Sequence, residues 1–310
     1  MAVDERSLIP VVCGPTAAGK SAIALWLARR ASVTIIAADS RQIYRGFDIG
    51  TAKPTAEEQA AVPHRGIDLI QPTERYSAAA WADDADRWVE ESRLTQRLPL
   101  VVGGTGFYLR ALFEPLFEEP QLDVVRRRHL ETLFDSMSLQ ELKRWCGVLD
   151  PERSHLGRTQ LLRAIEVALL TGRRLSALHR DRARPARRSA RYLVVDPGLA
   201  LADRIATRLD AMLAGGWVEE VTRLSNEVPA NAPSWKASGY RAVAEYVHGG
   251  ISRAAMREQI LIETRQYAKR QRTWFRHQLD EGCVTRVNPG DPSWRDVAES
   301  WLHETLGGPA

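Results

Sequence analysis

The chain has 310 residues, 44% of them hydrophobic and 26% charged, with a formal net charge of +4 at pH 7. These values are ordinary for a globular protein and allow one large domain plus a smaller one. No apolar run approaches the roughly 20 residues of a membrane span, and the first residues lack a secretion leader, so we expect a cytoplasmic protein without a membrane partner. The three cysteines, Cys13, Cys146 and Cys283, lie far apart and suggest neither a disulfide framework nor a zinc site.

Residues 14–21 form a complete G-x-x-x-x-G-K-S phosphate loop. The loop follows the apolar run Leu8–Cys13 and precedes an Ala-rich helical stretch, so a strand delivers a glycine-rich turn to a helix N-terminus. There, unpaired backbone N–H groups and the helix dipole hold phosphate oxygens. Lys20 adds a mobile positive charge, and the Ser21 hydroxyl is placed to ligate Mg²⁺. The loop predicts binding of a di- or triphosphate, whether or not a nucleotide carries it.

Strand-like apolar runs alternate with helical stretches along much of the chain. Such alternation predicts a parallel sheet built from right-handed crossovers and covered by helices on both faces. Ligands bind outside the carboxyl ends of such strands, so the loops that follow them should carry the chemistry. The expected strands are Leu8–Cys13, Val33–Ala38, Ile67–Ile70, Leu98–Val102 and Tyr192–Val195. We therefore predict an α/β fold: a P-loop NTPase-like parallel sheet flanked by helices, with an all-helical insertion domain.

Two of these strands end in conspicuous loops. The polar run 39–42 follows the second strand; its carboxylate, Asp39, could help hold Mg²⁺, act as a general base or cap the next turn. We favour a functional role, because a dense polar run at a strand end is hard to explain as packing. Glycines at 103, 104 and 106 follow the fourth strand and allow close approach to a ligand, with the Thr105 hydroxyl among them. Such glycines often only allow the backbone to turn and have no role in ligand binding.

The middle of the chain has helical patterns at 122–147 and 159–171 and no convincing strand. We expect a helical insertion domain at 115–190 between core segments 1–114 and 191–310. Residues 173–191 hold eight arginines and one acid. Such a run is either a solvated linker or a phosphate-binding surface, and together with a phosphate loop it favours nucleic acid as a partner.

The last third of the chain is predicted to be helical from Leu199 to Arg276, with breaks at Gly215-Gly216, 229–233 and Gly249-Gly250. After Glu281 only one further helix is expected, over Trp294–Leu306. The segment 263–276 interleaves basic and aromatic residues. One interpretation is a solvated face whose aromatic residues pack inward, and another is a phosphate-contacting face directed toward RNA; neither excludes the other. The residues concerned are Arg265, Lys269 and Arg272 or Arg276 in one stripe, with Tyr267 and Trp274 as the aromatic pair.

Five segments in this order resemble the tRNA dimethylallyltransferases (tRNA isopentenyltransferases) of the bacterial type. They are G-P-T-A-A-G-K-S, A-D-S-R-Q-I-Y-R-G-F-D-I-G-T-A-K-P, V-G-G-T-G-F-Y-L, R-A-I-E-V and T-R-Q-Y-A-K-R-Q-R-T-W-F-R, spread from residue 14 to 276. The resemblance implies transfer of a dimethylallyl group from dimethylallyl diphosphate to N6 of adenosine 37 in tRNAs that read codons starting with U. It also implies that the insertion domain closes over the anticodon stem-loop, with Mg²⁺ as cofactor.

The resemblance also assigns roles to individual residues. It implies that Asp39 is the general base, that Thr16 binds the donor and that Arg208 contacts the diphosphate. The implied diphosphate cradle is Gly14, Pro15, Thr16, Ala17, Ala18, Gly19, Lys20 and Ser21, with Ser21 on Mg²⁺. The implied tRNA contacts are Asp39, Ser40, Arg41, Gln42, Thr105, Arg126, Thr159, Gln160, Leu161, Leu162 and Arg163. The chain departs from the family pattern in the segment Arg153–Gln160, which lacks the usual Asn-Asp-Pro before its Arg, and at Ala18 and Ser238.

Two other functions compete with this one. A P-loop kinase of a small metabolite would explain the loop and Lys20 but neither 39–54 nor 264–276, and the strand Leu98–Val102 ends in glycines instead of the aspartate that holds Mg²⁺ in such enzymes. A non-catalytic RNA-binding protein with a vestigial loop would not need Lys20, Ser21 and Asp39 intact. Nothing in the sequence demands a partner chain, so we expect a monomer.

Overall fold

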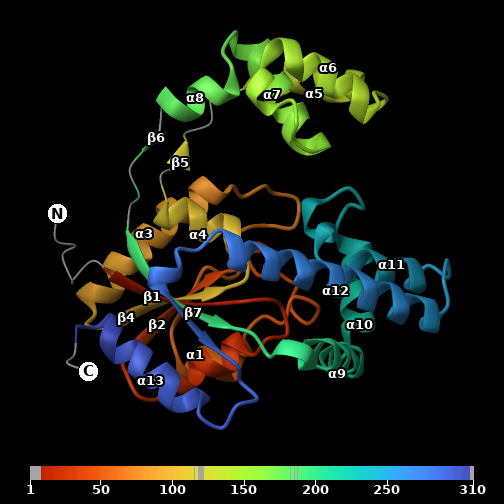
Figure 1. Ribbon diagram of the computed structural model, residues 1–310. Coiled ribbons are helices and arrows are strands. Elements are labelled where there is room, and N and C mark those ends of the chain that lie inside the picture. Colours follow the sequence, from red (N-terminus) through yellow and green to blue (C-terminus); the bar gives the residue numbers. More distant parts are fainter. Residues whose placement is uncertain are drawn as a thin grey trace. The chain divides into compact units, whose positions relative to one another are not determined.

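The computed structural model describes residues 8–114, 116–117, 122–181, 183–184, 186 and 188–307. The chain divides into two compact units, one made of Met1–Glu114 with Arg187–Ala310 and the other of Pro115–Ala186. Two arginines of the basic run, Arg182 and Arg187, lie outside the described residues. The first unit contains a parallel sheet with helices around it, and the second is mainly helical (Figure 1).

Within the described residues, six strands form one sheet in the order β3-β2-β4-β1-β7-β8, and all neighbours in it are parallel. The central strands are buried along nearly their whole length, as their continuous apolar runs predict. The strands are β1 (Leu8–Cys13), β2 (Val33–Ala38), β3 (His64–Arg65), β4 (Leu98–Gly103), β7 (Ser189–Val195) and β8 (Val284–Val287).

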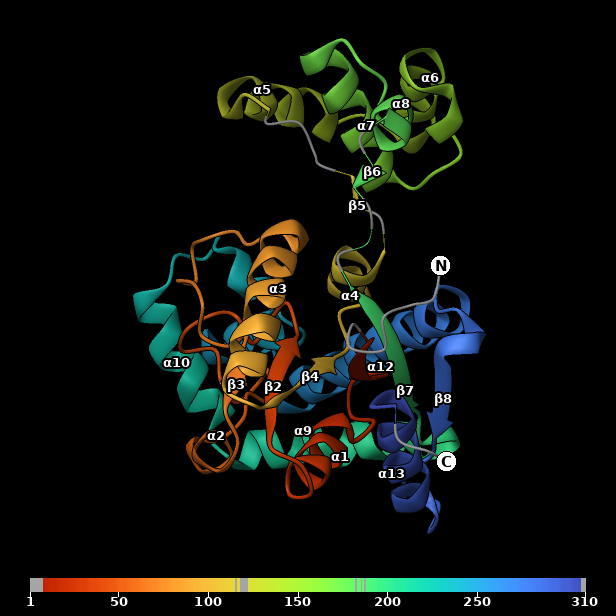
Figure 2. The same cartoon turned by 90° about the vertical axis from the view of Figure 1, so that its left-hand side faces the viewer.

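Helices cover both faces of this sheet (Figures 1 and 2). α1 and α13 pack on one face, where Ile23 and Leu27 meet Val12, Leu100 and Trp301 in a common apolar cluster. α3, α4 and α12 lie on the other face. The helices of this unit are α1 (Lys20–Ala28), α2 (Ala56–Ala61), α3 (Ala78–Leu94), α4 (Gly106–Phe113), α9 (Leu201–Ala214), α10 (Trp217–Glu227), α11 (Tyr240–Val247), α12 (Arg253–His277) and α13 (Trp294–Thr305).

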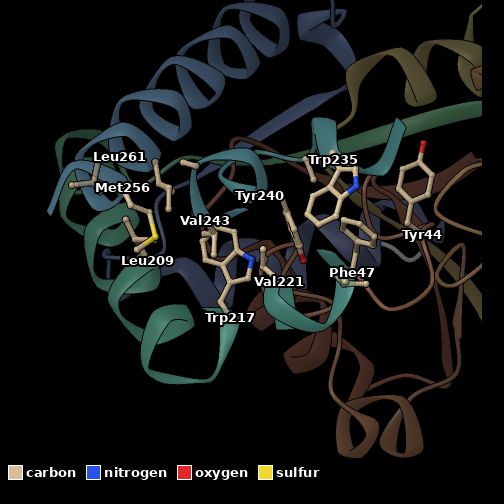
Figure 3. Packing of buried hydrophobic residues seen from close by; sticks show 14 of the residues in the cluster. Tyr44, Phe47, Leu209, Trp217, Val221, Trp235, Tyr240, Val243, Met256 and Leu261 are labelled. Atoms are coloured by element: carbon tan, nitrogen blue, oxygen red, sulfur yellow. The ribbon is translucent and has the colours of Figure 1, made fainter. Parts of the chain in front are cut away.

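A second apolar cluster joins the segment after β2 to the C-terminal helices (Figure 3). The Phe47 ring lies 4.8 Å from the Tyr240 ring and 5.3 Å from the Trp235 ring, and Tyr240 in turn meets Trp217 edge-on at 5.4 Å. Aromatic pairs at these separations stabilise a fold beyond the area they bury. The cluster therefore fixes residues 43–47, and with them the polar loop that starts at Asp39, against α10 and α11.

The second unit consists of α5 (Val124–Asp135), α6 (Leu139–Leu149), α7 (Arg158–Thr171) and α8 (Leu175–Asp181), with a short antiparallel pair of strands, β5 (Leu116–Phe117) and β6 (Ala183–Arg184). Its core contains Phe134, Leu142 and Ile165, all 0% exposed. The Arg158 guanidinium donates to the carbonyl oxygens of Phe134, Asp135 and Met137, which ties the start of α7 to the end of α5.

The α/β architecture with a parallel sheet is confirmed, and four of the five expected strands and the helices after Leu199 are present. The strand expected at Ile67–Ile70 is wrong: β3 is His64–Arg65, and Asp68 has φ +53°, a left-handed conformation that ends an extended run. Only Ile70 makes an isolated bridge, to Tyr44. The sequence also missed β8, a four-residue edge strand, and the pair β5–β6, whose strands are too short to leave a pattern.

Candidate active site

The phosphate loop runs from β1 to α1 in a backbone path that requires glycine. Gly14 has φ +144°, and a Cβ there would lie 2.2 Å from the carbonyl oxygen of Val195 on β7. Gly19 has φ +103° and caps α1, so the backbone amides at the start of this helix face the loop. Ser21, in the first turn of α1, is exposed. The local geometry is that of an anion site at a helix N-terminus.

Two adjoining cavities open beside this loop, of about 840 and 420 Å³. Asp39, Thr16 and Arg208 line both of them. β4 lies between β1 and β2, so the strand that leads to Asp39 is not a direct neighbour of the strand that leads into the phosphate loop. Asp39 nevertheless lines the same cavity as the loop. The larger cavity is also lined by Ala17, Gly19, Lys20, Ser21 and Gln42, and the smaller one by Ala17 and Arg41. Neither lining includes Gly14, Pro15, Ala18, Ser40 or Thr105.

Positive charge is concentrated at the loop. The Lys20 ammonium donates to the Pro15 carbonyl oxygen at 2.8 Å, and the Arg208 guanidinium donates to the Thr16 hydroxyl at 3.2 Å. Burial and the neighbouring Arg208 charge lower the pKa of Lys20 to about 8, although the Asp39 carboxylate opposes the shift. Burial also lowers the pKa of Arg208, and the Asp39 carboxylate again opposes the shift. Two cations held this close are destabilising by themselves and favour an anionic ligand between them.

A second arginine of α9 also approaches the loop. Arg204 precedes Arg208 by one helical turn, and its terminal nitrogen lies 3.0 Å from the position that a Cβ on Gly19 would take. Residues four apart on a helix share a face, so both guanidinium groups point toward the phosphate loop. The spacing of the two arginines was visible in the sequence, but the position of α9 beside the loop was not.

The Asp39 carboxylate stands at the carboxyl end of β2. Its Oδ1 accepts from the Arg41 backbone N–H at 2.8 Å, while the next amide, that of Ser40, donates to the Thr105 hydroxyl oxygen at 3.0 Å. Burial and the Asp39 charge raise the pKa of Tyr267 to about 12, and they also raise that of Tyr108. Both phenols therefore stay neutral at ordinary pH, and Asp39 has neutral and cationic neighbours.

The polar segment that begins at Asp39 is held by buried partners. Gln42 donates to the carbonyl oxygens of Thr51 and Ala52 at 3.2 and 2.9 Å, which closes the segment into a loop. Glu220, 7% exposed, accepts from the backbone N–H groups of Asp48 and Ile49 and from the Tyr240 hydroxyl. These bonds hold the loop beside the cavity.

The basic stripe on α12 is only partly free. Arg265, Lys269 and Arg276 are exposed, but Arg272 donates to Asp196 and to the Gly198 carbonyl oxygen, both at 2.5 Å. We conclude that Arg272 holds the end of β7 and does not extend the stripe, since its charge is already paired. The aromatic residues do turn inward: Tyr267 lines both cavities, and Trp274 packs against Gly106.

The remaining expected tRNA contacts lie in the helical unit. Arg126, Thr159 and Gln160 are exposed, and Arg163 pairs with Glu166 at 3.3 Å. Leu161 is 0% exposed and Leu162 packs against the same core, so neither side chain is available for a surface contact. The spacing of apolar residues in α7 explains this burial, because both leucines belong to the apolar face of the helix.

Among the described residues, no group of three or more acidic, histidine or cysteine side chains could hold a metal ion, and no helix is long and apolar enough to cross a membrane. Mg²⁺ on a phosphate ligand usually needs only one or two protein oxygens, because phosphate oxygens and water complete its shell. The exposed Ser21 hydroxyl at the cavity fits that limited role.

Comparisons with known proteins identify the family of the chain. A family model described as IPP transferase matches residues 42–278, and one described as isopentenyl transferase matches residues 8–65. The tRNA dimethylallyltransferase of Cupriavidus necator is 42% identical over 93% of this chain and 94% of its own length. That of Halorhodospira halophila is 43% identical over 96% and 99%.

Solved structures point the same way. A tRNA isopentenylpyrophosphate transferase of Bacillus halodurans is 30% identical over 97% of both chains, with a TM-score of 0.69. A eukaryotic dimethylallyltransferase acting on tRNA, only 22% identical, shares the fold with a TM-score of 0.80 over 98% of this chain and 80% of its own. The chain belongs to the tRNA dimethylallyltransferase family of prenyltransferases, enzymes of tRNA modification.

Proposed function

We propose that the protein transfers the dimethylallyl group of dimethylallyl diphosphate to N6 of adenosine 37 in tRNAs that read codons starting with U. One observation carries the proposal: Asp39, Thr16 and Arg208 line the same two cavities, and Lys20 lines the larger. A phosphate-binding site and a carboxylate base thus face one space, as a transfer between a diphosphate and an amine requires. The relatives named above support the substrates.

The diphosphate is the leaving group in this reaction. Lys20, Arg208 and the amides at the start of α1 neutralise its charge as the bond between the allylic C1 and the diphosphate oxygen breaks. Ser21 is the residue that would hold Mg²⁺ there, and the ion would supply further neutralisation. Thr16, which accepts from Arg208, orients the donor at the junction of the two cavities.

The adenosine amine is the nucleophile. Its lone pair forms the new bond to C1, and the Asp39 carboxylate accepts the N6 proton, so the products are the prenylated base and free diphosphate. Adenosine 37 must leave the stack to reach Asp39, at a cost of a few kcal/mol that is least in a loop. We assign RNA contacts near the base to Ser40, Arg41, Gln42 and Thr105, and contacts with the anticodon stem-loop to the helical unit, through Arg126, Thr159, Gln160 and Arg163.

The test is incubation with Mg²⁺, labelled dimethylallyl diphosphate and an unmodified tRNA that has A36, A37 and A38. Label in adenosine 37 supports the proposal, whereas ATP turnover with a small metabolite and unlabelled RNA refutes it. Asp39→Asn keeps the size of the side chain and removes the base, so we expect transfer to fall about 10²- to 10⁴-fold while tRNA binding persists. Asp203→Asn, at an exposed position on α9, is the matched control.

A further inference from the structure

Gln271 bridges two loops that carry different halves of the site. It lies on α12 and is 7% exposed. Its Oε1 accepts from the Thr16 backbone N–H at 2.8 Å, and its Nε2 donates to the Gly104 carbonyl oxygen at 2.8 Å. Thr16 belongs to the phosphate loop and Gly104 to the turn after β4, so one buried amide connects the two.

The glycines of that turn let α12 come this close. A Cβ on Gly104 would lie 2.4 Å from the Gln271 amide nitrogen, and one on Gly106 would lie 2.3 Å from the ring of Trp274, one turn further along α12. Real Cβ contacts are not this short, so a larger residue would displace the Gln271 amide at one position or the Trp274 ring at the other. Both glycines therefore serve the docking of α12.

The chain of contacts continues from Gly104 to Asp39, the proposed general base. The adjacent Thr105 hydroxyl oxygen accepts from the Ser40 backbone N–H at 3.0 Å, and Ser40 directly follows Asp39. An unbroken path thus runs from Thr16 through Gln271, Gly104, Thr105 and Ser40 to Asp39. Each of its links is a covalent bond or a hydrogen bond of ordinary length.

Gln271 also changes what the phosphate loop offers to a ligand. Anion-binding loops act through backbone N–H groups that point into the site. The Thr16 N–H is instead committed to Gln271, and the residue presents its hydroxyl, which accepts from Arg208. Thr16 therefore takes part through its side chain, at a place fixed by α12.

We propose that Gln271 is a positioning residue that fixes Thr16, and with it the reacting carbon of the donor, relative to the Asp39 base. The inference rests on the proposed function, because it assumes a donor at Thr16 and a proton acceptor at Asp39. Gln271 lines the larger cavity, but both hydrogen bonds of its side-chain amide go to backbone groups, so we assign it no contact with the reacting atoms. Its loss should lower kcat and leave the KM for dimethylallyl diphosphate nearly unchanged, since Lys20 and Arg208 still bind the diphosphate. A misplacement of about 1 Å costs up to about 100-fold in rate, and we expect a loss of 10- to 100-fold.

The test compares Gln271→Leu and Gln271→Glu with the wild type in the labelled transfer assay. Leucine removes both hydrogen bonds. A protonated glutamic acid can replace both, because its carbonyl accepts from Thr16 and its O–H donates to Gly104; the ionised form cannot donate. The ratio of kcat for Gln271→Glu to wild-type kcat should therefore rise as the pH falls from 8 to 6. Lys20, Asp39, Arg208 and Tyr267 line the same cavity in both proteins, so the comparison is made as a ratio to the wild type at each pH.

Gln278→Leu is the matched control, because Gln278 is exposed at the end of the same helix, and within the described residues its side-chain amide donates only to the adjacent His277 carbonyl oxygen. A Gln271→Leu kcat within twofold of the wild type, or a loss that appears only in KM, would overturn the inference. If Gln271→Leu does not fold, a pH-independent ratio for Gln271→Glu overturns it as well. Failure of the wild type itself to label tRNA would instead refute the proposed function.

Discussion

The lowered pKa of Lys20 predicts how diphosphate binding depends on pH. Burial and the Arg208 guanidinium bring the pKa of Lys20 to about 8, so its ammonium is about nine-tenths charged at pH 7 and about one-tenth charged at pH 9. A neutral amine cannot neutralise the leaving group. If only the charged form binds well, the affinity for dimethylallyl diphosphate falls about tenfold between pH 7 and pH 9.

The Tyr108 and Tyr267 phenols and the Cys13 thiol do not titrate in this interval. The pKa of Tyr267 is raised to about 12, and burial raises the pKa values of Tyr108 and Cys13 above their ordinary range. The phosphate groups of the ligand finish ionising near pH 6 to 7, so a loss of affinity at higher pH belongs to the protein. The bound anion favours the charged form of Lys20 and so raises the pKa of Lys20 in the complex. The affinity for the anion therefore falls as the pH rises and Lys20 loses its proton.

Titration calorimetry with dimethylallyl diphosphate and Mg²⁺, at pH 7 to 9.5 and without tRNA, measures this dependence. Lys20→Met should bind more weakly at pH 7 and show no slope, so that the two proteins converge at high pH. An affinity of the wild type that stays constant up to pH 9.5 would refute the reasoning. A Lys20→Met variant that keeps the wild-type slope would refute it equally, because the titrating group would then lie elsewhere.

Three further predictions concern the surroundings of the site. Tyr240→Phe removes a donor to the buried Glu220 carboxylate and should lower the free energy of unfolding by about 1–3 kcal/mol in urea titrations; no change would mean that Glu220 finds water instead. Leu161→Ala in the core of the helical unit should cost about 2–5 kcal/mol, seen by hydrogen exchange as faster exchange in α5–α7 with the sheet unaffected. Arg204→Gln should weaken inorganic diphosphate binding by up to about fivefold, and an unchanged dissociation constant would remove Arg204 from the loop's charge.

The sequence predicted the parts of the site that depend on local pattern. A strand, a glycine-rich turn and a helix follow one another within about twenty residues, so the phosphate loop and its anion site could be predicted from the sequence. Asp39 was predicted to be a functional residue for the same reason, because it directly follows a buried strand. The strand prediction at Ile67–Ile70 was wrong because an apolar run in the sequence does not reveal a left-handed backbone. Asp68 has that conformation, and of this segment Ile70 alone forms a β-bridge.

Contacts between distant segments could not be predicted. Gln271 and Thr16 are 255 positions apart, and only the docking of α12 on the turn after β4 brings them together. One signal was available: Gln271 is a polar residue between Ala268 and Phe275 on the buried face of its helix, where a polar side chain needs a partner. The pairing of Arg272 with Asp196 is of the same long-range kind, and it removes a charge from the basic stripe, which the sequence left open as a solvated or an RNA-facing surface.

The central claim is that the phosphate loop holds a leaving group and that ATP is not consumed. A single-turnover reaction with tRNA, Mg²⁺, dimethylallyl diphosphate labelled in its diphosphate, and ATP labelled separately measures this directly. We predict that one labelled diphosphate is released for each adenosine 37 modified, at the same rate, and that ATP stays intact. Hydrolysis of ATP in step with the reaction, or diphosphate release without modified tRNA, would contradict the account.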